Sequence, residues 1–407
     1  MTEEQTKIGL QLLELEFGKK RVHAAIEAVK QFKIEIPSWI FGPFGGGRFG
    51  DYMPPGAARN IEEKLQDAAV VHRLTGSTEY VAMHMLWDFS DDGYLGCYSV
   101  AQHVNEMAGE LNLKIGSISP TYFLRGSHRN TFAAVERETA ERYVEQTVLA
   151  ARIAKDFGDD LITLWFPDGS NYPGQTELRQ DYERMKEHLI TARQTISNDV
   201  WILVEYKVFE PGTYSTTIPD WGTAFSLVKA MGGNTGVLVD LGHHFHSANI
   251  EQIVARLVAE QLPCGFHFNT RYAADDDHAV EPTPEMARIF YELVSGGVIV
   301  NKKQEKNWAY MIDQCSGREN RIHAILHSVD MLQHCLAKAM LVDGPALQAL
   351  QRSDEIILAN RLFNNALLLA DVRPIVAAAR LEQLLPLDPV AAYVESGYQK
   401  KIEAERQ

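Results

Sequence analysis

Short apolar segments alternate with longer amphipathic segments along most of the chain, and this alternation constrains the fold more than any other feature of the sequence. Several of the short segments are apolar on both faces, which is typical of parallel strands that are covered by helices. Between them, apolar residues recur at spacings of three and four, which indicates amphipathic helices, as over residues 131–158. The predicted strands cover residues 33–40, 79–85, 114–119, 160–166, 200–206, 236–241, 264–268 and 308–313.

Eight successive strand–helix units predict a (β/α)₈ TIM barrel of the α/β class. The chain has 407 residues, and a barrel of this kind can exceed about 250 residues as a single unit. We therefore expect a catalytic barrel domain with an N-terminal helix over residues 1–345. Beyond it the sequence becomes purely helical, which predicts a C-terminal helical arm over residues 346–407 that makes subunit contacts.

Charge and composition exclude several classes of partner. The formal net charge of −15 is unlike the basic surfaces that bind nucleic acid or anionic membranes. No segment approaches the ~20 consecutive apolar residues of a membrane-spanning helix, and the N-terminus has no basic region followed by a cleavage site. The four cysteines lie far apart and form no CxxC pair, so we expect reduced thiols in a cytoplasmic protein.

Ionisable and aromatic side chains follow almost every predicted strand. In a barrel of this kind the functional groups lie where the strands end, at one face of the barrel. The residues at these positions are Trp39, His84, Trp87, Asp88, Trp165, Asp168, Glu205, Lys207, Asp240, His243, His267 and Asp313. A single strand-end acid is more often a helix cap, but a full ring of such residues predicts an active site.

The strand-end acids and histidines form a candidate metal set. Glu205, Asp240, His267 and Asp313 end the last four strands, and three carboxylates with one imidazole suit Mn²⁺, Mg²⁺ or Co²⁺ better than a thiolate-bound zinc ion. A second divalent ion could be held beside the first by a further group. This group is His243, Asp275 and Asp277. The two aspartates alternate along the chain, so both carboxylates can turn inward in an extended loop.

These residues lie in blocks that resemble a known family. The blocks are "HMLWD" (84–88), "LWFPDGSNYPGQ" (164–175), "VEYKVFEPGTYSTTIPDWGT" (204–223), "VDLGHH" (239–244), "GFHFN" (265–269), "DDD" (275–277) and "MIDQ" (311–314). They resemble the bacterial L-rhamnose isomerase and broad-specificity sugar isomerase group, which is related to xylose isomerase. The resemblance covers most of the chain. It is specific, because the ligand positions occur in the same order.

The resemblance implies a metal-dependent aldose–ketose isomerase that acts on L-rhamnose or a related sugar by a hydride shift between C1 and C2. It implies two ions, Mn²⁺ being the expected one, and a homotetramer. Glu205, Asp240, His267 and Asp313 then resemble the ligands of a structural ion, and His243, Asp275 and Asp277 those of a catalytic ion, with His267 near both.

The resemblance also gives roles to residues outside the metal set. Lys207 resembles the lysine beside the reacting carbons, and His84 a histidine that contacts the sugar ring. Trp87 and Trp165 resemble the walls of the sugar pocket. Asp313 or His84, acting through a water, could open the ring by general acid–base catalysis. Trp39 is a further candidate for the pocket, with core packing as the alternative.

Two differences from the family concern the choice of sugar. Thr270 and Arg271 replace the usual residues before the aspartates, and residues 120–130 form a shorter loop than in the family. Two other functions stay open. A sugar 3-epimerase on the same barrel would need a glutamate after the fourth strand, where the chain has residues 165–168. A non-catalytic sugar-binding protein would be expected to have lost at least one ligand.

Overall fold

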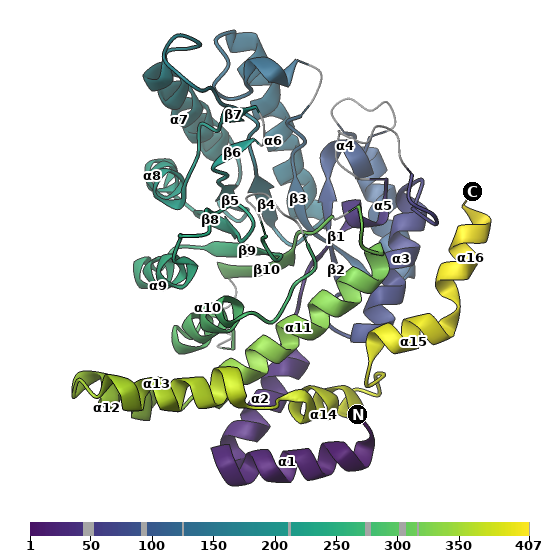
Figure 1. The fold of residues 1–407 in the computed structure, drawn as a ribbon. Coiled ribbons are helices and arrows are strands. Elements are labelled where there is room, and N and C mark those ends of the chain that lie inside the picture. The colour runs from purple at the N-terminus through teal and green to yellow at the C-terminus, as the bar shows by residue number, and fades with distance from the viewer. Residues whose placement is uncertain are drawn as a thin grey trace.

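The computed structural model describes residues 1–43, 53–90, 96–123, 126–210, 213–272, 278–300, 307–315 and 317–406 and shows a barrel of parallel strands surrounded by helices (Figure 1). The strands follow the order β1 (Ile36–Pro37), β2 (Tyr80–His84), β3 (Lys114–Ser119), β4 (Leu161–Leu164), β5 (Trp201–Glu205), β8 (Thr235–Asp240), β9 (Cys264–Phe268) and β10 (Trp308–Ile312). Glu35 closes the ring, since its backbone exchanges hydrogen bonds with Tyr310 and Ile312. The predicted TIM barrel is confirmed.

Helices lie between consecutive strands and cover the outside of the barrel. They are α3 (Ile61–Thr75), α4 (Met85–Asp88), α5 (Tyr98–Glu110), α6 (Arg137–Phe157), α7 (Leu178–Thr195), α8 (Trp221–Met231), α9 (Ile250–Glu260), α10 (Pro284–Ser295) and α11 (Arg321–Leu341). The residue just before the helix caps the first turn of α3, α8 and α9. In these positions Asn60, Asp220 and Asn249 each accept a side-chain hydrogen bond from the backbone N–H three residues later. Such caps satisfy N–H groups that have no partner inside the helix.

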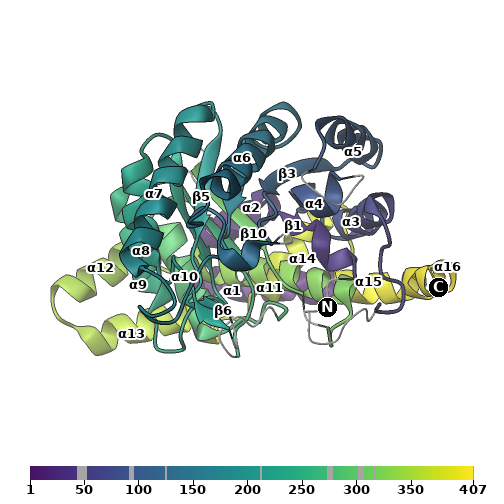
Figure 2. The same cartoon turned by 90° about the horizontal axis from the view of Figure 1, so that it is seen from above.

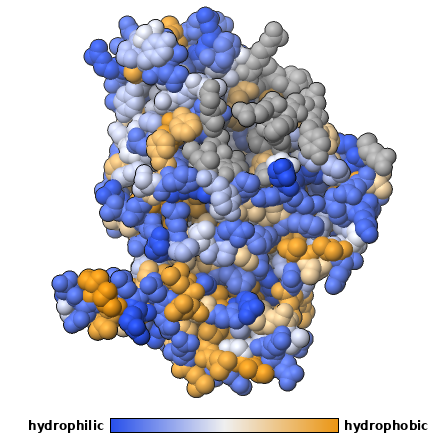
Figure 3. All heavy atoms as spheres, in the orientation of Figure 1, coloured by the Kyte–Doolittle hydropathy of each residue, from blue (hydrophilic) through white to orange (hydrophobic). Residues whose placement is uncertain are grey.

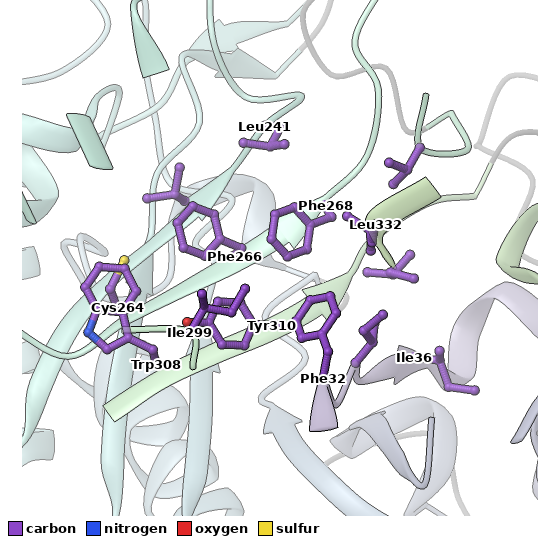
Figure 4. Close-up of a cluster of buried hydrophobic side chains, with 14 of the residues drawn as sticks. Phe32, Ile36, Leu241, Cys264, Phe266, Phe268, Ile299, Trp308, Tyr310 and Leu332 are labelled. Carbon is purple, nitrogen blue, oxygen red and sulfur yellow. The ribbon is translucent and has the colours of Figure 1, made fainter. Parts of the chain in front are cut away.

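Alternation along the strands separates the core from the site. On β9, Phe266 and Phe268 point outward and stack on Tyr310, which in turn contacts Phe32 (Figure 4). His267 lies between the two phenylalanines and therefore faces the barrel interior. Below the rim, that interior is filled by a small apolar cluster. Its members are Leu161, Trp201, Leu203, Leu238 and Met311.

The other side of the barrel interior is polar. The buried carboxylate of Glu35 accepts hydrogen bonds from the backbone N–H of Ser117, at 3.0 Å, and from the hydroxyl of the same residue. The hydroxyls of Ser119 and Thr163 lie 2.6 Å apart. Burial raises the pKa of Glu35 to about 7, although the hydrogen bonds from Ser117 oppose this shift.

Three local predictions differ from the structure. The first strand ends at Pro37, which has no N–H to continue the ladder, and Trp39 lies in a 3₁₀ helix, η1 (Ser38–Phe41). The helix expected over residues 131–158 begins only at Arg137, because Asp168 binds the backbone N–H groups of Thr131 and Ala133. A short hairpin that the sequence did not predict, β6 (Phe209–Glu210) and β7 (Tyr214–Ser215), follows β5.

One helix of the C-terminal end, over residues 373–382, packs against both N-terminal helices outside the barrel, where the helices of the two chain ends lie. These are α1 (Glu3–Phe17) and α2 (Lys19–Gln31) at the start, and α12 (Gly344–Arg352), α13 (Ile356–Asn364), the π-helix η5 (Asn365–Leu369), α14 (Arg373–Glu382), α15 (Pro389–Ser396) and α16 (Tyr398–Glu405) at the end. The last helix returns to the barrel, where the buried Arg406 binds Asp67 of α3 at 2.7 Å (Figure 1).

This helical layer leaves large apolar side chains exposed. Leu12 and Leu15 of α1 are 63% and 84% exposed, and Ile357 and Leu369 are 71% and 76% exposed (Figure 3). The expected role of the arm in subunit contacts stays a prediction. Among the described residues, no single helix is long and apolar enough to cross a membrane. Two consecutive helical segments that are bent relative to each other, Ile356–Leu369 and Arg373–Glu382, have the required length and apolarity only in combination.

Candidate active site

Four of the predicted metal ligands meet at the rim where the strands end. Glu205 ends β5, Asp240 ends β8, His267 lies on β9, and Asp313 follows β10 directly. The Nδ1 atom of His267 is 3.3 Å from Oε1 of Glu205. The same nitrogen is 3.6 Å from Oδ2 of Asp240 and 3.6 Å from Oδ2 of Asp313. Parallel strands thus bring three carboxylates from distant parts of the sequence around one imidazole nitrogen.

His243, in the loop after β8, belongs to the same cluster. Its Nδ1 lies 3.2 Å from Oε1 of Glu205 and 3.1 Å from the backbone oxygen of Tyr206. Ligand atoms of Glu205, Asp240 and His243 all lie within 4.8 Å of one another, and those of Asp240, His267 and Asp313 form a second group of the same size. Asp240 belongs to both groups, so the described residues offer two adjoining places for a divalent cation.

The environment of Asp240 fits a bound cation. Its Oδ1 accepts hydrogen bonds from the backbone N–H of Gly242 at 2.7 Å and from the side chain of Asn269 at 3.0 Å. Within the described part of the chain, its Oδ2 accepts no hydrogen bond, although the residue is fully buried. A buried carboxylate oxygen that accepts no hydrogen bond costs free energy, and a bound metal ion would remove that cost. The sequence reasoning missed Asn269, which lies two residues after His267, just past the end of β9.

Opposite charges balance the cluster when no metal is considered. Burial opposes charging His267, but the charge of Glu205 and the close approach of the Asp240 and Glu205 carboxylates to its Nδ1 raise its pKa well above the usual value. Burial likewise opposes ionising Glu205, yet the charge of His267 and hydrogen bonds from His243 and His267 hold its pKa below the usual value. The imidazolium therefore occupies the electrostatic role that a divalent cation would take.

Aromatic rings line one side of the rim and form a continuous wall. The ring of His84 lies 5.0 Å from that of Trp39 and 4.2 Å from that of Trp87. Phe123 connects Trp87 to Trp165, with ring distances of 5.5 Å and 5.1 Å. The sequence reasoning missed Phe123, because it treated residues 120–130 only as a shortened loop.

His84 and Trp39 are both buried in this wall. Burial lowers the pKa of His84 to about 3, so its imidazole is neutral, and its Nδ1 lies 3.1 Å from the hydroxyl of Thr121. The indole N–H of Trp39 donates a hydrogen bond of 2.9 Å to Oδ1 of Asp313. Trp39 thus links the aromatic wall to the candidate metal ligands, a role beyond packing in the core.

Lys207 projects toward the wall from the segment after β5. Its ammonium group is buried, lies 5.1 Å from the centre of the Trp165 ring, and donates a hydrogen bond of 3.0 Å to Glu210 of the β6–β7 hairpin. A cation over an indole ring is stabilised by the electron-rich face of the neutral ring. The structure therefore places a buried ammonium group against Trp165 of the aromatic wall, on a residue that follows Glu205 by two positions.

Asp88 and Asp168 hold the scaffold instead of joining the metal cluster. Asp88 accepts hydrogen bonds from the hydroxyl of Ser38 at 2.6 Å and from the ammonium group of Lys64 at 2.7 Å. Its Oδ2 also accepts one of 2.7 Å from the backbone N–H of His84, which fixes the start of α4. Asp168 is engaged by the loop before α6, as described above. These bonds occupy both carboxylates.

Two predicted ligands, Asp275 and Asp277, lie outside the described residues. The segment that precedes them is held by Arg271, whose guanidinium donates a hydrogen bond of 2.6 Å to the backbone oxygen of Phe245 and pairs with Glu285 at 3.1 Å. Phe245 follows His243 by two residues. Arg271, one of the residues that departs from the family pattern, therefore ties the loop of His243 to α10.

Comparison with known proteins identifies the family. Residues 75–286, slightly more than half of the chain, match the family described as the xylose isomerase-like TIM barrel. A probable sugar isomerase of Rhizobium meliloti (strain 1021) is 34% identical over 394 residues, which cover 94% of this chain and 89% of that protein. The chain belongs to the xylose isomerase-like TIM barrel family. A second family member, a probable sugar isomerase of Mesorhizobium japonicum, is 33% identical over 392 residues, with coverage of 93% and 87%.

Solved structures agree with this assignment at the level of the fold. The structure of an L-ribulose 3-epimerase superposes with a TM-score of 0.53 and 12% sequence identity, covering 80% of this chain and 98% of the epimerase. An AP endonuclease of family 2 from Brucella melitensis superposes with a TM-score of 0.50 and 13% identity, covering 72% and 97% of the two chains. The xylose isomerase-like barrel thus carries more than one chemistry, and the choice rests on the site.

Proposed function

We propose that this member of the xylose isomerase-like family is a metal-dependent aldose–ketose isomerase that acts on L-rhamnose or a stereochemically related sugar. The observation that carries the proposal is the pair of adjoining ligand groups that share Asp240, set beside a buried lysine and an aromatic wall. The relatives named probable sugar isomerases, and the L-rhamnose isomerase motifs in the sequence, support the substrate class.

The ligand set fits two divalent ions, of which Mn²⁺ is the first to test. Glu205, Asp240, His267 and Asp313 would hold one ion, and His243 with Asp275 and Asp277 would hold the other beside it, where Asp240 also lies within 4.8 Å of a ligand atom of His243. Such ions, when bound, supply Lewis-acid polarisation of sugar oxygens and orientation of the substrate. Oxygen-rich ligands of this kind favour Mn²⁺, Mg²⁺ or Co²⁺ over softer metals.

The remaining residues would bind the sugar and control its protons. Trp87 and Trp165 offer flat apolar faces for the C–H faces of the ring and keep water from the reacting carbons. Lys207, with its buried ammonium group, would donate a hydrogen bond to the oxygen that gains negative charge as hydrogen moves between C1 and C2. The neutral His84 or Asp313, through a water, would move the proton between O1 and O5 when the ring opens.

A sugar 3-epimerase is the alternative, and the position after β4 argues against it. The acid at that position is Asp168, whose Oδ2 accepts hydrogen bonds from the backbone N–H groups of Thr131 and Ala133 and whose Oδ1 accepts one from the Thr131 hydroxyl. It therefore has no free oxygen to take a proton from C3 of a ketose. The L-ribulose 3-epimerase similarity is one of fold and does not alter this difference in residues.

Product analysis separates the two activities. The protein is stripped with EDTA, reloaded with Mn²⁺ and incubated with L-rhamnose, other aldoses and, separately, ketoses. An isomerase converts an aldose into the corresponding ketose, whereas an epimerase converts one ketose into its C3 epimer. Asp240→Asn should abolish conversion, while Asp199→Asn, an exposed acid paired with Lys155, should leave it unchanged. Ketose epimerisation with no aldose conversion would overturn the proposal.

A further inference from the structure

Helices α6 and α7 enclose a groove on the outer surface of the barrel. In Figure 1 both lie on the opposite side of the strands from α12–α14; in Figure 2, seen from above, α6 lies apart from these helices and α12 appears in projection beside α7 and α8. The groove has a volume of about 710 Å³ and contains neither the metal cluster nor the aromatic wall. Its α6 side carries half-buried apolar residues, Val144, Val148 and Leu149, and the neighbouring Val135 is 74% exposed. Apolar surface of this kind, rimmed by charges, is typical of a contact site.

The charges on α6 are ordered symmetrically about its apolar centre. Moving outward from that centre, Glu141 lies on one side and Arg152 on the other, both exposed and both lining the groove. Further out, Arg137 and Asp156 occupy matching positions, again with opposite signs. Within the helix, Arg137 pairs with Glu141 and Arg152 with Asp156. At these four positions, which span about 28 Å, each half of the helix is the charge complement of the other half.

A second copy of α6, laid antiparallel, meets an opposite charge at each of these four positions. With the two-fold axis between residues 146 and 147, Glu141 faces Arg152 of the other copy and Arg137 faces Asp156. Val144 then faces Leu149. Because the relation is symmetric, each of these contacts forms twice. The groove-lining residue without a complement is Glu145, which would face Val148.

We propose that the α6–α7 face is a two-fold interface between two copies of this chain. The four helices would pack as an antiparallel bundle with an apolar centre and complementary charged ends. A different protein would need to reproduce this order of charges by its own sequence, whereas a second copy carries it by construction. The interface is separate from the C-terminal arm, so it does not depend on the subunit contacts expected there, and it does not rest on the proposed enzymatic activity.

Charge reversal tests the contact between Glu141 and Arg152. Sedimentation equilibrium of the full chain gives the association constant for each variant. Glu141→Arg should weaken association by about tenfold, because two favourable pairs become two repulsive ones. Adding Arg152→Glu restores opposite charges and should restore association. Glu183→Arg makes the same change of charge on an exposed residue of α7 outside the groove lining and is the matched control. Melting temperatures and far-UV circular dichroism show whether each variant is folded.

Cross-linking tests the register directly. In the double variant Val144→Cys, Leu149→Cys, the two cysteines are five positions apart on one helix and cannot bond to each other within a chain. Mild oxidation should give a disulfide-linked dimer whose linked peptides join position 144 to position 149. The proposal is overturned if the parent is monomeric at all concentrations, if the double charge reversal fails to restore association, or if dimers form without the 144–149 link.

Discussion

Asp240 and His267 lie side by side at the ends of two paired strands, with Nδ1 of His267 3.6 Å from Oδ2 of Asp240. The other oxygen of Asp240 is fixed by Gly242 and Asn269, so Oδ2 is the atom left for a ligand. Because β8 and β9 are hydrogen-bonded in register, the two side chains are held at this separation by the backbone of the barrel.

The first prediction concerns the acid shared by both ligand groups. Asp240→Asn removes one negative charge from each group, so we expect Mn²⁺ affinity to fall by at least about a hundredfold. Elemental analysis after dialysis should find little metal bound. Asp313→Asn is the matched comparison, because Asp313 belongs to only one of the two described groups and the other ligands remain. Equal metal content in the parent and the Asp240 variant would contradict the assignment.

The second prediction concerns stability and metal. Two like charges about 4 Å apart repel by roughly 4 kcal/mol at an effective dielectric constant near 20, and several carboxylates share this rim. A ligand that binds only the folded state stabilises it by about 2.7 kcal/mol at a hundredfold excess over its dissociation constant. Mn²⁺ should therefore raise the melting temperature and EDTA should lower it. The difference should be larger at pH 8 than at pH 5, because protons compete with metal for the ligands. Melting curves that EDTA does not change at either pH would rule out the site.

The third prediction concerns the path of the hydrogen. The described site offers Lys207 and neutral His84 near the metal cluster, and its carboxylates are ligands or scaffold acids, so we expect hydrogen to pass between C1 and C2 without exchange. Deuterium at C2 of the aldose should appear at C1 of the ketose, as measured by NMR. Extensive exchange of the label with solvent would indicate proton transfer through an enediol instead.

The fourth prediction concerns the buried acid below the site. The pKa of Glu35 is raised to about 7, so its contribution to stability is present below its unfolded pKa and is lost as pH rises through 7. The shift corresponds to about 3 kcal/mol at one unit per 1.36 kcal/mol. Glu35→Gln should remove this loss, so the variant should gain stability relative to the parent between pH 5 and pH 8. Urea unfolding at several pH values measures the free energy of unfolding of both proteins. A difference between them that stays constant with pH would contradict the prediction.

The fifth prediction separates a scaffold acid from the metal ligands. Asp88→Asn leaves the buried ammonium group of Lys64 without its counter-charge, which should cost about 3–5 kcal/mol of unfolding free energy. Metal content should stay at the parent level. Asp199→Asn, on the exposed surface, should change stability by less than about 1 kcal/mol. Loss of bound metal in the Asp88 variant would show that Asp88 acts in the site.

The sequence by itself determined the barrel and the face that carries the site. Apolar runs and helical spacing repeat eight times, and parallel strands of such a chain have one closed arrangement in which their ends share a rim. For that reason Glu205, Asp240, His267 and Asp313 could be grouped before any distance was known. The alternation of side chains along β9 likewise predicts that His267 faces inward between two core phenylalanines.

Which side chains contact one another could be seen only in the folded structure. Phe123 joins Trp87 to Trp165, Trp39 binds Asp313, and Asn269 orients Asp240, through contacts that depend on loop paths and rotamers. Local sequence patterns carry the period of a strand or helix, but not the direction of a loop that packing and buried hydrogen bonds between distant segments determine.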